Sequence, residues 1–154
     1  MSKVSKAVIL FIAEGAYSGK SPFAPGTAGT LVGVLLYAAV MNAGLLPYSI
    51  LTCLVCIIGT WAAGKAEVLL AKRDSPSIVI DEIAGFLVSM FLVPVGWGYV
   101  AAGFLLFRAF DIVKPWPLYD VQDVHGGLGV MLDDIGAGVY TNILLQLAAY
   151  VVGR

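Results

Sequence analysis

Charged residues are scarce in this sequence, and their scarcity excludes most soluble classes of protein. Only 12% of the 154 residues are charged, whereas an ordinary soluble domain carries roughly 25%. Hydrophobic residues make up 60% of the chain, and the mean hydropathy is +0.93. The formal net charge of −1 gives no basic field of the kind that attracts nucleic acid. We therefore expect one membrane-embedded domain over residues 1–154.

Cysteine is also scarce, with only Cys53 and Cys56 in an apolar segment. Their Cys-x-x-Cys spacing superficially resembles a metal or redox pair. The sequence has no second cysteine or histidine pair to complete such a site, so both are expected to be small structural residues on a helix. A secretory signal is not predicted, because the apolar run at 7–13 is short and lacks a cleavage site.

Three long stretches contain no charged residue: 21–64, 83–107 and 135–153. A membrane-spanning helix needs about 20 predominantly apolar residues. The first stretch is long enough for two helices, at about 28–46 and 48–64. The last stretch predicts one helix, at about 134–152.

The middle stretch allows two interpretations, one long span or a hairpin that turns at 94–98. Proline and glycine lie close together in this segment (Pro-Val-Gly-Trp-Gly), which is typical of a turn. Trp97 and Tyr99 suit a membrane interface. In the hairpin, the two arms extend to about Ile78 and Val113.

The basic residues favour the hairpin. It places all ten acids and eight of the nine basic residues, all except Arg154, on one side. The positive-inside rule assigns that side to the cytoplasm, whereas one long span would divide the charges. We therefore predict an all-α, multi-pass transmembrane helical bundle of about five membrane helices. A further helix over 2–16 is expected to lie in the interface. Its apolar side would contain Val4, Val8, Phe11 and Ile12.

Two pairs of acids interrupt apolar segments. Asp81 and Glu82 follow Ile-Val-Ile, and Asp133 and Asp134 follow Val-Met-Leu. Acids at a helix N-terminus are often only dipole partners, but ionisable groups in membrane helices are generally paired or functional. Together with Asp111, they offer five carboxylates from three helices, and Mg²⁺ prefers oxygen ligands. We predict a shared metal site, with the small residues after each pair allowing close helix packing.

Basic residues and a glycine–threonine segment accompany these acids. Arg108, Asp111 and Lys114 are spaced by three, so they would share one helix face. The segment 25–30 (Pro-Gly-Thr-Ala-Gly-Thr) leads into the first predicted span. Its amides and hydroxyls could hold a phosphate, or Thr27 or a neighbour could simply cap the helix. Acids and bases beside an anion site favour metal-assisted phosphoryl chemistry.

Missing motifs exclude the other common phosphatase chemistries. The sequence has no Cys-x₅-Arg for a cysteinyl-phosphate and no Asp-x-Asp-x-Thr/Val for an aspartyl nucleophile. Its single histidine, His125, cannot form a two-histidine site. His125 lies in a glycine-rich loop, either as a proton donor to a leaving oxygen or as an ordinary loop residue. A metal-activated water remains as the nucleophile.

Two other classes of function compete with this interpretation. A cation transporter would need polar groups near the middle of the membrane, whereas the predicted charges lie at one end. A non-catalytic membrane subunit would leave the buried acids unexplained.

Four motifs in order resemble the phosphatidylglycerophosphatase A family. They lie at 25–30, 80–85, 107–117 and 127–138, and the resemblance covers roughly residues 14–140. It implies a Mg²⁺-dependent, multi-pass enzyme of the bacterial inner membrane with its active site on the cytoplasmic face. The implied reaction hydrolyses phosphatidylglycerophosphate to phosphatidylglycerol and phosphate in glycerophospholipid biosynthesis.

The residues and the resemblance together give a specific site hypothesis. Mg²⁺ is expected on Asp81, Glu82, Asp133 and Asp134. The catalytic set is expected to be Asp81, Asp111, Asp134, Arg108 and Lys114, with Asp111 as a further ligand or base. The substrate phosphate is expected on Gly26, Thr27, Arg108 and Lys114, because arginine offers a planar fork and lysine a point charge.

Overall fold

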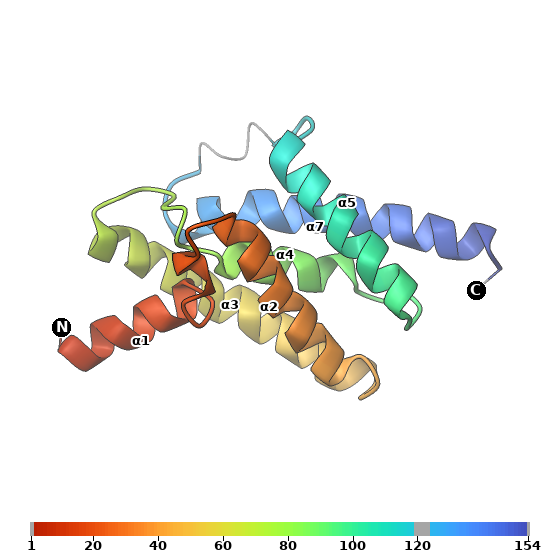
Figure 1. The fold of residues 1–154 in the computed structure, drawn as a ribbon, viewed down its shortest axis with the longest axis horizontal. Coiled ribbons are helices and arrows are strands. Elements are labelled where there is room, and N and C mark those ends of the chain that lie inside the picture. Colours follow the sequence, from red (N-terminus) through yellow and green to blue (C-terminus); the bar gives the residue numbers. More distant parts are fainter. Residues whose placement is uncertain (1, 119–123, 154) are drawn as a thin grey trace.

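The structure is a computed structural model that describes residues 2–118 and 124–153. Within these residues every regular element is helical, which confirms the all-α class (Figure 1). The elements are α1 (Lys3–Ala13), the short 3-10 helix η1 (Ser18–Lys20), α2 (Pro25–Val40), α3 (Leu45–Leu70), α4 (Ile80–Ser89), α5 (Trp97–Val113) and α7 (Gly127–Val151).

Helix α4 is the centre of the fold. It packs against α2, α3, α5 and α7, and eight of its ten residues are buried. Phe86 and Leu87 are fully buried in it. A helix that is apolar on every side belongs inside a protein or in a membrane, and α4 is covered by its own neighbours.

Helix lengths do not confirm the expected five membrane spans. Among the described residues, two helices, α3 and α7, are long and apolar enough to cross a membrane. At 16 and 17 residues, α2 and α5 are shorter. The ten residues of α4 extend about 15 Å at 1.5 Å per residue, about half the hydrocarbon thickness. The predicted arm from Ile78 is therefore a buried core helix.

The middle charge-free stretch is interrupted, as the hairpin interpretation requires. Helix α4 ends at Ser89 and α5 begins at Trp97. The charged ends of the two helices meet, with Arg108 Nη1 of α5 lying 3.9 Å from Glu82 Oε1 of α4. The single long span is therefore wrong for this segment.

Helix α7 begins earlier than predicted and approaches α4 closely. It starts at Gly127 rather than near residue 134, so the acids at 133 and 134 lie inside it and do not open it. The early start is stabilised by Met131, which is buried against Gly59 of α3. A Cβ added to Gly138 would lie 2.4 Å from the carbonyl oxygen of Gly85 in α4. Small residues thus allow the close packing that the sequence predicted.

The two loops predicted to face away from the site lie together. Residues of the α2–α3 loop and of the α4–α5 turn line one cavity of about 330 Å³. The rings of Tyr48 and Phe91 contact each other there, with centroids 5.9 Å apart. In α1, Val4, Val8 and Phe11 are exposed, and its interfacial position remains a prediction. Arg154 and residues 119–123 lie outside the described residues.

Candidate active site

Three carboxylates from two helices form the centre of the candidate site. Asp81 and Glu82 lie in the first turn of α4, and Asp134 lies in α7. One oxygen of each lies within 4.8 Å of the others. Asp81 Oδ1 and Glu82 Oε2 are buried with no hydrogen-bond partner among the described residues. Like charges buried this closely repel, and a divalent cation with oxygen ligands would satisfy all three.

Asp133, the fourth predicted ligand, lies outside this group of three. Its carboxylate accepts a hydrogen bond from Lys114 Nζ just beyond the end of α5. Burial lowers the pKa of Lys114, but the hydrogen bond that Lys114 donates to Asp133 and the charges of Asp133, Asp134 and Asp111 outweigh this effect and raise the pKa. Lys114 therefore stays charged and holds Asp133 as a counter-ion.

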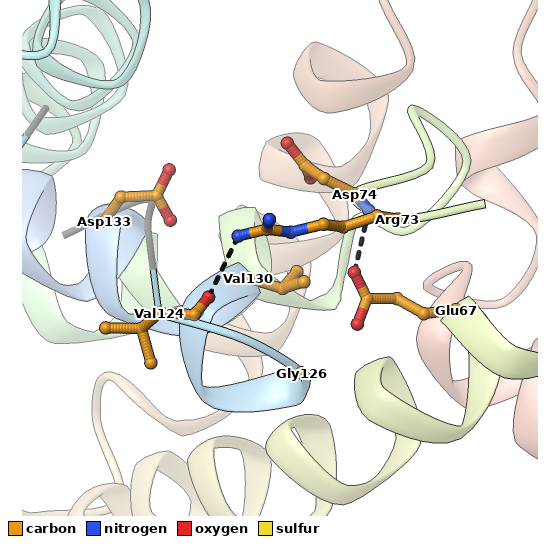
Figure 2. A pocket seen from close by; sticks show the side chains of 8 residues that line it. Glu67, Arg73, Asp74, Val124, Gly126, Val130 and Asp133 are labelled. Carbon is orange, nitrogen blue, oxygen red and sulfur yellow. Dashed lines mark hydrogen bonds between the residues drawn. The ribbon is translucent and has the colours of Figure 1, made fainter. Parts of the chain in front are cut away.

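Asp133 also lines a small polar cavity (Figure 2). Its volume is about 20 Å³, which is room for about one water molecule. Glu67 and Asp74 also line it, and the Asp74 amide donates to Glu67 Oε1 at 2.8 Å. Sequence reasoning missed this group, because Asp133 follows Asp74 by 59 positions along the chain.

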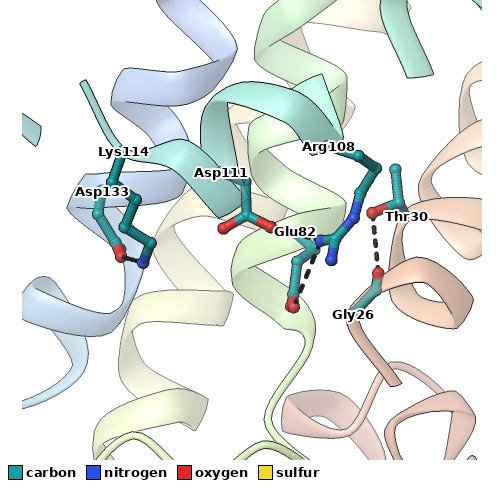
Figure 3. A network of polar contacts seen from close by, with 7 residues as sticks. All are labelled: Gly26, Thr30, Glu82, Arg108, Asp111, Lys114 and Asp133. Atoms are coloured by element: carbon teal, nitrogen blue, oxygen red, sulfur yellow. Dashed lines mark hydrogen bonds and ion pairs between the residues drawn. The ribbon is translucent and has the colours of Figure 1, made fainter. Parts of the chain in front are cut away.

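Arg108, in α5, contacts the carboxylates and lies between α4 and the start of α2 (Figure 3). Its Nη1 donates to Asp111 Oδ2 at 2.5 Å, one turn along α5, as the spacing of three predicted. The same nitrogen lies 3.9 Å from Glu82 Oε1. Arg108 Nε is buried without a hydrogen-bond partner among the described residues. Asp111 in turn lies beside Asp134, so the acids and the arginine form one network.

The start of α2 contacts this network directly. A Cβ added to Gly26 would lie 2.3 Å from Glu82 Oε1 and 2.9 Å from Arg108 Nη1. Thr30, which is buried, donates its hydroxyl to the Gly26 carbonyl at 2.8 Å. Ala24 is the N-cap and makes no side-chain cap bond, so Thr27 lies inside the helix and does not cap it. The amides at the start of α2 therefore have no side-chain cap, and Gly26 brings this end of the helix next to Glu82 and Arg108.

His125 and Glu14 lie apart from the three-carboxylate group. His125 is exposed in the loop before α7. Glu14, which the sequence reasoning did not single out, is buried after α1, with Oε2 lying 3.3 Å from Lys20 Nζ. It was missed because it lies at the end of a segment that was interpreted as an interfacial helix.

The fold and the site together define a helical protein with a polar site of acidic and basic residues. The described part of the chain is all-helical, has two helices able to cross a membrane, and carries buried acids beside an arginine and a lysine. The particular family follows from comparison with known proteins. The chain belongs to the phosphatidylglycerophosphatase A family, whose profile matches residues 11–149.

Three curated relatives agree with this assignment at the level of a phosphatase. "Phosphatidylglycerophosphatase A" of Escherichia coli is 38% identical over 146 residues, which cover 93% of this chain and 82% of the relative. The Haemophilus influenzae protein of the same name is 34% identical over 145 residues, with coverages of 92% and 89%. "Putative phosphatidylinositol-3-phosphatase" of Bacteroides thetaiotaomicron is 40% identical over 154 residues, with coverages of 94% and 95%. No solved structure matches the chain. The protein is thus a phosphatase of phospholipid metabolism.

Proposed function

We propose that the protein hydrolyses phosphatidylglycerophosphate to phosphatidylglycerol and inorganic phosphate in glycerophospholipid biosynthesis. The observation that carries this proposal is the meeting of three carboxylates, those of buried Asp81 and Asp134 and of half-buried Glu82, with Arg108 and the start of α2. Family membership supports the same reaction. The enzyme would reside in the bacterial inner membrane as a multi-pass protein, with this site on the cytoplasmic face.

The carboxylates fit a resident Mg²⁺. Asp81, Glu82 and Asp134 would hold it, since one oxygen of each lies within 4.8 Å of the others. Asp81 Oδ1 and Glu82 Oε2 are also buried with no hydrogen-bond partner in the described part of the chain. Asp133, the residue before Asp134 in α7, is proposed as a further ligand. A divalent ion in such a site supplies neutralisation of phosphate charge and acidification of water.

Arg108 and the start of α2 are proposed to bind the phosphate. The planar guanidinium can offer two parallel donors to phosphate oxygens. Amides at Gly26 and Thr27 would bind another oxygen, helped by the positive end of the α2 dipole. Lys114, which stays charged beside Asp133, would add a point charge on the opposite side.

The hydrolysis itself requires one bond to form and one to break. A water oxygen adds to phosphorus, and the bond from phosphorus to the glycerol oxygen breaks. Asp111, oriented by Arg108, would accept the proton of the attacking water, and the leaving oxygen takes up a proton to become the hydroxyl of phosphatidylglycerol. In this proposal the acids of α4 and α7 meet at the cytoplasmic end of the helices, so the phosphate would react there while the lipid tails remain in the membrane.

Phosphate release from defined lipids tests this function. Purified full-length protein in uncharged detergent should release phosphate from phosphatidylglycerophosphate with Mg²⁺, and a chelator should abolish the release. Full activity in chelator would end the metal proposal. Ion flux through liposomes, measured on the same preparation, tests the transporter alternative and should be absent.

A second candidate substrate is phosphatidylinositol 3-phosphate. It is favoured by the name of the Bacteroides thetaiotaomicron relative, which is 40% identical to this chain. Both substrates are phosphomonoesters on a lipid head group, so the same site chemistry would serve either. Comparing kcat/KM for the two lipids decides between them, and we expect the higher value for phosphatidylglycerophosphate.

A further inference from the structure

An apolar groove lies between α5 and α7, beside the candidate active site. Its volume is about 290 Å³. The lining side chains are all uncharged: Phe110, Pro115, Trp116, Tyr140, Ile143 and Leu144. We call this feature the α5–α7 groove. Trp116 is 81% exposed, and Ile143 and Leu144 are about half exposed, so the groove opens to the outside of the molecule.

Two contacts hold the lining residues together. The rings of Phe110 in α5 and Tyr140 in α7 contact each other, with centroids 5.8 Å apart. The Tyr140 hydroxyl donates to the carbonyl oxygen of Trp116 at 3.2 Å. This bond ties the segment after α5 to α7, so the two sides of the groove are linked to each other.

One end of the groove lies next to the charged network along the chain. Phe110 and Pro115 are the sequence neighbours of Asp111 and Lys114, which belong to that network. Along α7, Tyr140 follows Asp133 by seven residues, which is two turns or about 10 Å on the same face. The groove then runs away from the acids, past Ile143 and Leu144, into the charge-free part of α7.

We propose that the α5–α7 groove binds one acyl chain of the lipid substrate. This inference rests on the proposed function, because the phosphate at Arg108 and the start of α2 positions the attached lipid. The lining offers no charged partner, which suits hydrocarbon and not a polar head group or a peptide backbone. About 290 Å³ is near the lower limit of a small-molecule site, so it accommodates part of one chain and not two.

The groove would therefore distinguish lipid substrates from their water-soluble head groups. A substrate with long chains gains affinity from apolar surface buried in the groove. The deacylated head group, a glycerophosphoglycerol phosphate, reaches the same charged network but gains nothing from the groove. Filling the groove should thus raise the apparent KM for the long-chain lipid and leave the head group unaffected.

Leu144→Trp tests this expectation, with Leu35→Trp on the exposed face of α2 as its matched control. We expect Leu144→Trp to raise the apparent KM for long-chain phosphatidylglycerophosphate in detergent micelles by about tenfold, the loss of roughly two buried methylenes. Its kcat/KM for the deacylated head group should match the wild type. Equal KM values for Leu144→Trp and Leu35→Trp would overturn the proposal.

Two further measurements keep the proposal testable if Leu144→Trp does not fold or if the purified protein releases no phosphate. If Leu144→Trp loses activity on both substrates, Trp116→Ala, which removes an exposed wall, is compared with Trp61→Ala on α3 and should alone raise the KM for the lipid. Phosphatidylglycerophosphate with a photoreactive group in one acyl chain should crosslink to residues 143–144 of the wild type. Crosslinks elsewhere would contradict the groove even if phosphate release is normal. Absent phosphate release with crosslinks at 143–144 would contradict the proposed reaction and not the groove.

Discussion

Arg108 illustrates how single residues organise the site. Its guanidinium on α5 contacts Asp111 of the same helix, approaches Glu82 of α4 and lies against Gly26 of α2. A largely buried guanidinium needs compensating charge, and Asp111 and Glu82 supply it. The arginine therefore fixes the relative positions of three helices at the point where we place the phosphate.

Neutralising a carboxylate of the group of three should remove activity and leave the fold intact. In Asp134→Asn or Asp81→Asn, the amide relieves like-charge repulsion, so the variant should stay folded. Loss of a metal ligand should lower the rate on the order of a thousandfold, at about 1.36 kcal/mol per tenfold. Mg²⁺-dependent phosphate release measures this, and Glu67→Gln, which keeps an acceptor for the Asp74 amide, is the matched control. Near-normal turnover in Asp134→Asn would remove Asp134 from the site.

A single methyl group at Gly26 should disturb the site from the α2 side. The added Cβ of Gly26→Ala would lie 2.3 Å from Glu82 Oε1, so the carboxylate or the helix must move. A displacement of about 1 Å can lower a rate about a hundredfold, and we expect a loss of that order in kcat/KM. Gly98→Ala in α5, where a Cβ would meet nothing within 4 Å, should behave like the wild type. Equal activity in both variants would contradict a role for the α2 start.

At the residue scale, sequence spacing predicted some contacts and not others. Arg108 and Asp111 were paired correctly, because a spacing of three always places residues on one helix face. Asp133 and Asp134 could not be separated by sequence alone. Successive side chains point about 100° apart around a helix, and only the packing of α7 on α4 decides which one joins Asp81.

Helix α4 can end after ten residues because side chains of α7 donate hydrogen bonds to carbonyl oxygens at and just beyond its C-terminus. Asn142 Nδ2 donates to the carbonyl oxygens of Ser89 and Phe91, at 3.0 Å and 2.6 Å. Gln146 Nε2 adds a bond to Phe91 at 3.3 Å and one to Asn142 Oδ1 at 2.8 Å. The carbonyls at a helix C-terminus lack intrahelical partners, and these side-chain amides replace the missing bonds.

Removing this cap should destabilise the helix bundle. Asn142→Leu deletes both donors and leaves two carbonyls with fewer partners, which we expect to lower the free energy of unfolding by about 1 kcal/mol. Denaturant unfolding in detergent micelles measures the change. Asn42→Leu, in the exposed α2–α3 loop, is the control and should unfold like the wild type. An unchanged unfolding midpoint in Asn142→Leu would show that the cap contributes little.

The type of each element was easier to predict from the sequence than whether protein or lipid covers it. The break in the middle stretch was predicted from Pro94, Gly96 and Gly98, because these residues favour a turn. The burial of α4 was not predicted, since a helix covered by protein and one covered by lipid have the same apolar composition. The early start of α7 at Gly127 was missed for a related reason, because contacts of Met131 with α3 outweigh the poor helix propensity of glycine.

The molecule as a whole has two chemically different ends. One end holds the acids, Arg108 and Lys114. The other holds the α2–α3 loop and the α4–α5 turn, which together line an apolar cavity that contains no charged side chain. A charge distribution of this kind is what the positive-inside rule predicts for a protein oriented in a membrane. The structure brings the two loops together, whereas the side of the membrane that each end faces remains a prediction.

Site-specific tags test that orientation and the position of the site with it. Tags at 43 and 96, in the two loops that share the apolar cavity, should be labelled in a bacterial host only from the periplasmic side. A tag at 74 should be labelled only from the cytoplasm, because Asp74 lines the small cavity next to Asp133 and reports on the charged end. A tag at position 122, which lies outside the described residues, should likewise be labelled only from the cytoplasm.

Activity of each tagged protein serves as the control, since a tag that disturbs the fold would also reduce phosphate release. Labelling of position 96 from the cytoplasm would contradict the hairpin orientation. In that case the end that carries Arg108 and Lys114 would face outwards against the positive-inside rule, and a cytoplasmic lipid phosphate could not reach Arg108. Labelling of 43 and 96 from opposite sides would be inconsistent with the contact between Tyr48 and Phe91, so the same experiment also tests the arrangement of the helices.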